Sequence, residues 1–223
     1  VLFDLDGTLL NTLDDLADAM NAALERTGFP SHPVSSYRYF VGDGVDVLVR
    51  RVLPSSAYTP SVHAQLREAM EDEYGQRWRA KSRPYEGIPT LLDALQERTL
   101  PIVVLSNKPE SFTVQAVAHL LPDWHFAIVR GARPKVPTKP DPTSALEMAD
   151  EMHIAPSDFI YLGDTNTDMQ TARAAGMYAL GATWGFRPGA ELLDSGAQHL
   201  LETPQQLLDC LLYTSDAADE VLG

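Results

Sequence analysis

The sequence has very little cysteine and few basic side chains. Cys210 is the only cysteine in 223 residues, which excludes a disulfide framework or a thiolate metal cluster and fits a reducing cytoplasm. Lys and Arg number 17 against 31 Asp and Glu, a formal net charge of -14. This charge argues against nucleic acid or an anionic membrane as the main partner. An anionic substrate would need positive charge concentrated at one place.

Long apolar runs are also missing. No stretch approaches the roughly 20 residues that cross a bilayer, and no signal peptide is visible, so we expect a cytoplasmic protein that does not bind membranes. The chain starts at Val1 with a strand already under way, and we expect the natural protein to have residues before it. Residues 212–223 resemble translated adapter sequence, and we expect them to be foreign to the natural protein.

Several common catalytic patterns are absent from the sequence. There is no Gly-x-Ser-x-Gly elbow and no Gly-rich phosphate loop ending in Lys-Ser/Thr, which argues against the hydrolases and nucleotidases built on those motifs. The six histidines lack the spacing of metal ligands. We interpret them as solvated or core residues.

The hydrophobic pattern divides the chain into two regions. Between Asp14 and Arg83 the periodicity predicts helices only, at 11–27, after Gly44 and at 62–79. From Ile88 onward predicted strands and helices alternate, with strands at 101–105, 126–129, 159–162, 178–180 and 199–201 and helices at 90–96, 112–121, 143–152 and 169–175. This alternation predicts an α/β fold with a parallel sheet, interrupted after its first strand by an all-helical insert.

Two carboxylates follow the first apolar stretch. Residues 1–3 have the character of a strand, and Asp4 and Asp6 lie at its carboxyl end before a Gly-Thr turn. Residues two apart in a strand face the same side, so both acids start out aimed at one place. The same pattern also fits a strand followed by an ordinary Asp-Gly turn.

Three later stretches place polar side chains directly after predicted strands, where ligands bind in open parallel sheets. Ser106 and Asn107 offer a hydroxyl and backbone N–H groups ahead of a helix, and Lys139 offers a point charge for a phosphate oxygen. Asp164 and Asp168 add two more acids. Each stretch has an ordinary alternative: a strand-to-helix turn, a solvated lysine, or a helix cap.

Taken together, the acids indicate a metal site. Asp4, Asp6 and Asp164 would repel one another at one site unless a hard cation with oxygen ligands joined them. Mg²⁺ is the ion we expect. It would neutralise the acids and an incoming phosphate, leaving one carboxylate as nucleophile and another to carry a proton.

The order and placement of these residues resemble the haloacid dehalogenase superfamily of phosphotransferases. Its four ordered motifs match residues 4–8, 106–107, 139–140 and 163–168, and the similarity extends to about Leu211. The resemblance implies a Rossmann-like parallel sheet with an inserted helical cap.

The resemblance also implies domain limits. We expect the catalytic core to comprise residues 1–13 and 84–211, and the cap to comprise residues 14–83. Hinges are expected near 11–15 and 84–87. Closure of the cap would exclude water and select the leaving group.

A role for each acid follows from the same resemblance. Asp4 would attack phosphorus to form an aspartyl-phosphate, and Asp6 would protonate the leaving oxygen and later activate water. Mg²⁺ would be held by Asp4, Asp164 and the backbone carbonyl of Asp6, with Asp168 steadying its water shell.

The remaining motif residues would bind phosphate. Ser106, Asn107 and Lys139 are implied to contact the transferring phosphoryl oxygens. Since the transition state spreads negative charge over those oxygens, a lysine and N–H donors stabilise it there.

Asp6 and the lysine content of the insert separate the branches of this superfamily. Dehalogenases lack the second acid, because a halide leaves without a proton. Phosphonate cleavage needs a cap lysine for a Schiff base, and no lysine lies between Asp14 and Arg79. Phosphate ester hydrolysis is therefore favoured.

One stretch of the insert resembles phosphoglycolate phosphatases. Residues 39–51 contain Gly42 and Gly44, whose backbone N–H groups at a helix start would approach a substrate carboxylate, and Arg50 or Arg51, which would pair with it. The alternative is an ordinary turn followed by solvated arginines.

The sequence thus predicts a Mg²⁺-dependent phosphatase of a small phosphorylated metabolite in carbohydrate metabolism, with 2-phosphoglycolate as the expected substrate. The alternatives are another capped relative (a pyrophosphatase, nucleotidase, sugar phosphatase or β-phosphoglucomutase-like enzyme) and a catalytically idle scaffold. An idle scaffold predicts disrupted motif residues, and Asp4, Asp6, Lys139 and Asp164 are all present. The protein is expected to be a monomer or homodimer.

Overall fold

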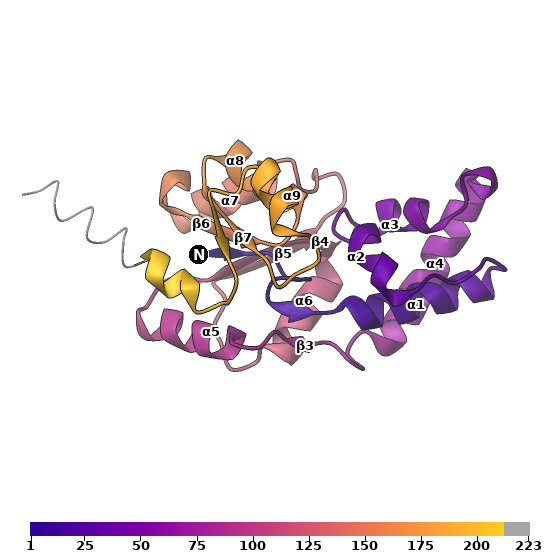
Figure 1. Cartoon of the computed structure of the whole chain (residues 1–223), viewed down its shortest axis with the longest axis horizontal. Helices are drawn as coiled ribbons and strands as arrows, with labels where there is room; N and C mark the ends of the chain where they lie inside the picture. Colours follow the sequence, from indigo (N-terminus) through magenta and orange to yellow (C-terminus); the bar gives the residue numbers. More distant parts are fainter. Residues whose placement is uncertain (212–223) are drawn as a thin grey trace, which may run out of the picture.

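The computed structural model describes residues 1–211 of the chain. A sheet with helices on both faces forms one end of the molecule, and a group of helices lies beside it (Figure 1). Within the described residues no helix is both long and apolar enough to cross a bilayer. The prediction that residues 212–223 are foreign to the natural protein lies outside the described residues.

A six-stranded parallel sheet forms the core, with the first strand in its middle. The strands are β1 (Leu2–Phe3), β4 (Val103–Pro109), β5 (Ile128–Ala132), β6 (Ile160–Gly163), β7 (Tyr178–Ala182) and β8 (His199–Leu201). Their order is β5-β4-β1-β6-β7-β8. Leu2 pairs with Val103 on one side and Tyr161 on the other. The ends of β4 and β6 therefore flank the residue that follows β1.

Helices cover both faces of this sheet. Successive side chains of a strand face opposite sides, so Phe3 packs in one apolar cluster and Leu2 in another. The first cluster includes side chains of α5 (Ile88–Glu97) and α6 (Glu110–Leu120). The second includes side chains of α7 (Thr143–Met152), α8 (Asn166–Ala175) and α9 (Gly189–Asp194). A 3₁₀ turn, Pro156–Asp158, precedes β6.

Four of the five α-helices between β1 and β4 form a helical cap (Figure 1). They are α1 (Leu13–Arg26), α2 (Tyr37–Phe40), α3 (Val45–Val52) and α4 (Pro60–Arg77), with 3₁₀ turns at Val34–Ser36 and Ser55–Ala57. Met20 and Leu24 of α1 are fully buried in one cluster with Leu66 and Met70 of α4. Each such side chain contributes roughly 1.5–3 kcal/mol when removed from water, so this packing holds the cap together.

The structure confirms the predicted α/β fold with a parallel sheet and a helical insert, and it extends the sequence prediction at specific points. β4 continues to Pro109 because Pro109 pairs with Ala132 beyond an irregularity in the ladder. A short antiparallel pair, β2 (Leu10–Asn11) with β3 (Arg83–Pro84), connects cap and core and was not predicted, since two-residue strands carry no periodic pattern. The exact domain limits stay a prediction.

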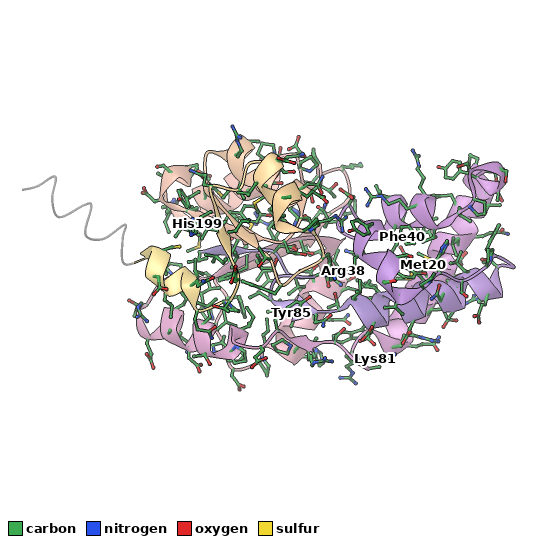
Figure 2. The ribbon with its side chains drawn as sticks, viewed as in Figure 1. Met20, Arg38, Phe40, Lys81, Tyr85 and His199 are labelled. Atoms are coloured by element: carbon green, nitrogen blue, oxygen red, sulfur yellow. The ribbon has the colours of Figure 1, made fainter. Side chains whose placement is uncertain are left out.

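A buried carboxylate secures the junction where the chain enters and leaves the cap. Asp15 of α1 is 1% exposed, and its oxygens accept hydrogen bonds from the backbone N–H groups of Lys81 and Ser82 and from the Ser82 hydroxyl at 2.7–3.0 Å. Lys81 lies at the lower edge of this junction in Figure 2. Asp15 therefore ties the first cap helix to the strand that returns to the core.

We expect Asp15→Asn to lower the free energy of unfolding by about 2–3 kcal/mol, because an amide N–H₂ replaces an acceptor that faces buried donors. Urea unfolding measures the change. The neighbouring Asp14→Asn, at an exposed position, is the control and should change the free energy by no more than about 0.5 kcal/mol. Equal stability of the two variants would contradict this role of Asp15.

Candidate active site

The strand register brings three predicted motifs to one edge of the sheet. Asp4 follows β1 directly, and its backbone N–H donates to Leu162 of β6 at 2.9 Å. Because β4 and β6 flank β1, Ser106 and Asp164 reach the same edge from either side. These residues are distant in sequence and become neighbours only through the parallel pairing.

Lys139 connects two of the acids. Its Nζ lies 2.7 Å from Asp4 Oδ1 and 2.6 Å from Asp168 Oδ1, and it also donates to the Leu105 carbonyl at 3.2 Å. All three charged side chains are almost completely buried. The backbone N–H of Lys139 donates to Asn107 Oδ1 at 2.9 Å, so Asn107 positions the lysine.

Asp168 has two functions in this structure. Its Oδ2 accepts a hydrogen bond from the Thr165 backbone N–H at 3.0 Å, which caps α8, while its Oδ1 binds Lys139. The sequence left a helix cap and a site residue as alternatives. The structure shows the helix cap and a contact with Lys139, and a role for Asp168 beside a metal ion stays a prediction.

Asp164 is held from two sides. Thr8 donates its hydroxyl to Oδ1 at 2.8 Å, and the Phe186 backbone N–H donates to Oδ2 at 2.8 Å. Gly7, at a φ of +97°, lets the turn after β1 approach this carboxylate, because any Cβ there would overlap the Asp164 oxygens. The Gly-Thr turn therefore positions Asp164.

Asp4, Asp164 and Asp168 together fit a metal ion. One carboxylate oxygen from each lies within 4.8 Å of the others, and all three side chains are buried. Burial, followed by the charge of Asp168, raises the pKa of Asp164 to about 7. Burial and Asp168 likewise raise the pKa of Asp4 well above its ordinary value, although Lys139 opposes this. One lysine does not balance three carboxylates, and a hard divalent cation suits an all-oxygen donor set.

Asp6 pairs with a different lysine, Lys108, and is not part of the group formed by Asp4, Asp164 and Asp168. Lys108 Nζ lies 2.6 Å and 2.7 Å from the two Asp6 oxygens, and the Thr12 hydroxyl donates to Oδ1 at 2.7 Å. Burial alone would lower the pKa of Lys108, but its interactions with Asp6 and Tyr74 together outweigh burial and raise it. The two acids after β1 are thus turned to different partners.

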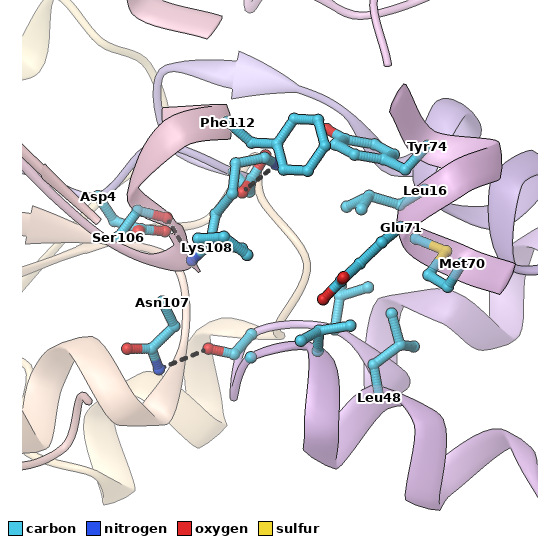
Figure 3. Close-up of a pocket in the computed structure, with 16 residues that line it drawn as sticks. Asp4, Leu16, Leu48, Met70, Glu71, Tyr74, Ser106, Asn107, Lys108 and Phe112 are labelled. Atoms are coloured by element: carbon cyan, nitrogen blue, oxygen red, sulfur yellow. Dashed lines mark hydrogen bonds and ion pairs between the residues drawn. The ribbon is translucent and has the colours of Figure 1, made fainter. Parts of the chain in front are cut away.

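A pocket between core and cap opens onto Asp4 and Asp6 (Figure 3). Ser106, Asn107 and Lys108 line it from the core. The cap contributes mainly apolar side chains, with one acid and one phenol: Leu16, Val41, Val45, Leu48, Met70, Glu71 and Tyr74. If a small molecule bound the acids through a polar group, the cap would therefore enclose the rest of that molecule.

The cap loop is docked on the core by backbone contacts. Asn107 Nδ2 donates to the Gly42 carbonyl at 3.0 Å, and Arg187 of the core donates to the Val41 carbonyl at 2.9 Å. In the reverse direction, Arg38 of the cap donates to the Gly185 carbonyl at 2.5 Å (Figure 2). These contacts hold the cap loop against the core beside the pocket.

The predicted cap residues have different positions. Gly44 lines the pocket, at a φ of +88° before α3. Arg50 stacks on the Tyr58 ring, and Arg51 pairs with Asp43 at 2.5 Å. Neither arginine is among the residues that line the pocket described here, and a carboxylate contact by them stays a prediction.

The Lys108 side chain was not among the predicted site residues. The prediction for this strand end was a hydroxyl and N–H donors from Ser106 and Asn107, whereas the Lys108 side chain is 5% exposed and reaches Asp6. Its signal in the sequence was its place directly after Ser106 and Asn107, on a strand end already assigned to the site.

In the absence of divalent ions, we expect the free energy of unfolding to fall as pH rises from about 4 to about 7. The folded pKa of Asp164, about 7, lies above its ordinary 3.8, so in this window the folded state holds a proton that the unfolded state has released. The slope from this group reaches at most about 1.4 kcal/mol per pH unit.

Urea unfolding in EDTA across this pH range measures the effect. Asp164→Asn removes the titrating group, and the decline should be smaller in this variant because its side chain cannot ionise. The same pH dependence in both proteins would contradict the assignment to Asp164.

Comparison with known proteins gives one consistent result. A family model for haloacid dehalogenase-like hydrolases matches residues 1–182. The phosphoglycolate phosphatase of Vibrio vulnificus is 30% identical over 221 residues, covering 96% of this chain and 96% of the relative. That of Thiobacillus denitrificans is 35% identical over 211 residues, covering 91% and 92%. The solved structure of a haloacid dehalogenase-like family hydrolase from Streptococcus pneumoniae, 23% identical, has a TM-score of 0.85 and covers 95% of this chain and 97% of its own. This chain belongs to the haloacid dehalogenase-like hydrolase family.

Proposed function

We propose that this protein is a Mg²⁺-dependent phosphomonoester hydrolase whose substrate is 2-phosphoglycolate. The observation that carries the proposal is the arrangement of the two acids after β1. Asp4 and Asp6 both line one pocket, yet Asp4 is bound by Lys139 and Asp6 by Lys108. Such a pair suits two separate tasks, nucleophilic attack and proton transfer.

The metal site of the proposed enzyme comprises Asp4 and Asp164, with the backbone carbonyl of Asp6 as a further ligand and Asp168 beside them. The proximity of the three buried carboxylates supports this. When bound, Mg²⁺ would supply positive charge next to the transferring phosphoryl group. It would also favour the ionised form of Asp4, whose pKa burial raises.

Asp4 is the proposed nucleophile. One of its oxygens bonds to phosphorus as the bond from phosphorus to the leaving oxygen breaks, which gives an aspartyl-phosphate and an alcohol. Asp6 donates the proton that the leaving oxygen needs. Asp6 then takes a proton from water as the water oxygen attacks phosphorus, which releases phosphate and restores Asp4.

Three buried groups are proposed to bind the phosphoryl oxygens. Ser106 and Asn107 line the pocket at the end of β4, and Lys139 Nζ lies next to the attacking carboxylate. Charge that develops on these oxygens would be stabilised by the ammonium group and by the N–H and O–H donors. Asn107 also fixes the backbone of Lys139, so its loss would disturb both contacts.

Two observations favour phosphoglycolate among phosphate esters. Relatives that share 30% and 35% identity over nearly their full length are phosphoglycolate phosphatases. The cap also closes the pocket with side chains such as Leu48 and Met70, which leaves little polar surface for a sugar or nucleoside. A cytoplasmic location fits this substrate and belongs to the same proposal.

The proposal predicts the kinetics of two variants. With Mg²⁺ present, Asp4→Asn should abolish turnover, with a loss of roughly 10⁴-fold or more, because an amide is a far weaker nucleophile than a carboxylate. Asp6→Asn should lower kcat by about 10²- to 10⁴-fold, the usual contribution of a proton donor. Steady-state release of phosphate measures both.

Assays should cover 2-phosphoglycolate, pyrophosphate, a nucleoside monophosphate and sugar phosphates, with exposed-site variant Asp14→Asn as control. The highest kcat/KM is expected for phosphoglycolate. Unchanged turnover in Asp4→Asn would reject the mechanism, and a higher kcat/KM for another ester would reject the substrate while leaving the mechanism intact.

A further inference from the structure

Lys108 occupies a position in the pocket that the proposed chemistry does not use. It lies at the end of β4, where its Nζ contacts both oxygens of Asp6. The same Nζ lies 5.0 Å from the centre of the Tyr74 ring on cap helix α4. The ammonium group thus lies between the proposed proton donor and the cap.

Charge is distributed unevenly over this pocket. Lys108 is the only cation among the described residues that line it, and most of the lining on the cap side is apolar. Lys139, although close to Asp4, is not part of that lining. Among the described residues that line the pocket, Lys108 is therefore the one cationic partner for a negative group on the leaving part of a substrate.

The position of the leaving oxygen follows from the role of Asp6. To receive a proton, this oxygen must lie within hydrogen-bond distance of the Asp6 carboxylate. Lys108 Nζ is within 2.7 Å of both oxygens of that carboxylate. In phosphoglycolate the carboxylate carbon is two bonds from the leaving oxygen, so the substrate carboxylate would lie next to Lys108.

We propose that Lys108 is a specificity-determining residue that binds the carboxylate of the leaving group. An ammonium group has three N–H donors; Asp6 accepts from Lys108 with both oxygens, and the Tyr74 side chain of the cap is its other hydrogen-bond partner. A substrate carboxylate would take the place of Tyr74 at Lys108 while the contact with Asp6 is kept. This inference rests on the proposed function, and it extends it by naming the group that distinguishes phosphoglycolate from neutral esters of similar size.

Glu71 limits where the anion can lie. It comes from α4, is paired with Arg67 at 3.0 Å, and Figure 3 shows its carboxylate pointing into the pocket. An anion near Glu71 would be repelled, whereas one beside Lys108 is attracted. The two charges together favour a short anionic leaving group at the core end of the pocket.

The test compares two phosphate esters of similar size, 2-phosphoglycolate and 2-hydroxyethyl phosphate, in the wild type and in Lys108→Met. Removing Lys108 also removes a partner of Asp6, which affects both esters. The ratio of their kcat/KM values therefore isolates recognition of the carboxylate. We expect this ratio to fall by roughly 100-fold in the variant, typical of losing one partner of a buried charge pair.

The possible results of this test distinguish an error in the role of Lys108 from an error in the proposed substrate. A wild type that shows no preference for phosphoglycolate over the neutral ester would contradict the proposed substrate. A wild-type preference that survives in folded Lys108→Met, with both kcat/KM values lowered equally, would contradict only the role of Lys108.

A second variant keeps the test decisive if Lys108→Met does not fold. Glu71→Gln changes an exposed side chain and removes the opposing charge. The kcat/KM for phosphoglycolate should rise by about two- to fivefold, with the value for 2-hydroxyethyl phosphate unchanged. Glu68→Gln, exposed on the same helix and outside the pocket lining, is the matched control. A fall, or an equal change for both esters, would contradict the charge argument.

Discussion

Three buried carboxylates share a single ammonium group at the carboxyl edge of the sheet, and the rest of the site depends on this imbalance. Lys139 contacts Asp4 and Asp168, whereas within residues 1–211 the hydrogen-bond donors to the Asp164 carboxylate are the Thr8 hydroxyl and the Phe186 N–H. Burying charges without full compensation costs free energy, which is visible in the raised pKa values of Asp4 and Asp164. A fold keeps such a cluster when another positive charge joins it in the working state.

Asp6, the second acid after β1, has partners that differ from those of Asp4. In the proposed mechanism this difference separates the two functions of the site. Asp6 is two residues from Asp4, yet it turns towards Lys108 and Thr12 at the edge of the cap pocket. In the proposed mechanism, the acid that bonds to phosphorus therefore lies with the proposed metal ligands, and the acid that moves protons lies on the side of the leaving group. The cap also contributes to the part of the site around Asp6. Tyr74 contacts Lys108, and the loop around Gly42 contacts Asn107.

Much of this arrangement could be predicted from the sequence, because strand ends in a parallel sheet meet at one edge. Asp4, Ser106 and Asp164 were assigned to one site on that ground, and the helix Thr143–Met152 has the predicted bounds. Lys108 lies at the same strand end and was still missed, because the sequence does not indicate which side chain there turns towards Asp6. Cap contacts are equally hard to predict. Helix periodicity indicates that α3 has an apolar face, but it does not say which arginine turns towards Asp43 or Tyr58.

The most direct test of this account is the melting temperature as Mg²⁺ is raised at constant pH and ionic strength. Because the ion would bind the folded state only, stability should increase with the logarithm of its concentration once the dissociation constant is exceeded. We predict that the wild type follows this dependence and that Asp164→Asn requires a much higher Mg²⁺ concentration for the same shift. A wild-type melting temperature that does not respond to Mg²⁺, or an Asp164→Asn variant that responds identically, would contradict the claim that a divalent ion balances the buried acids.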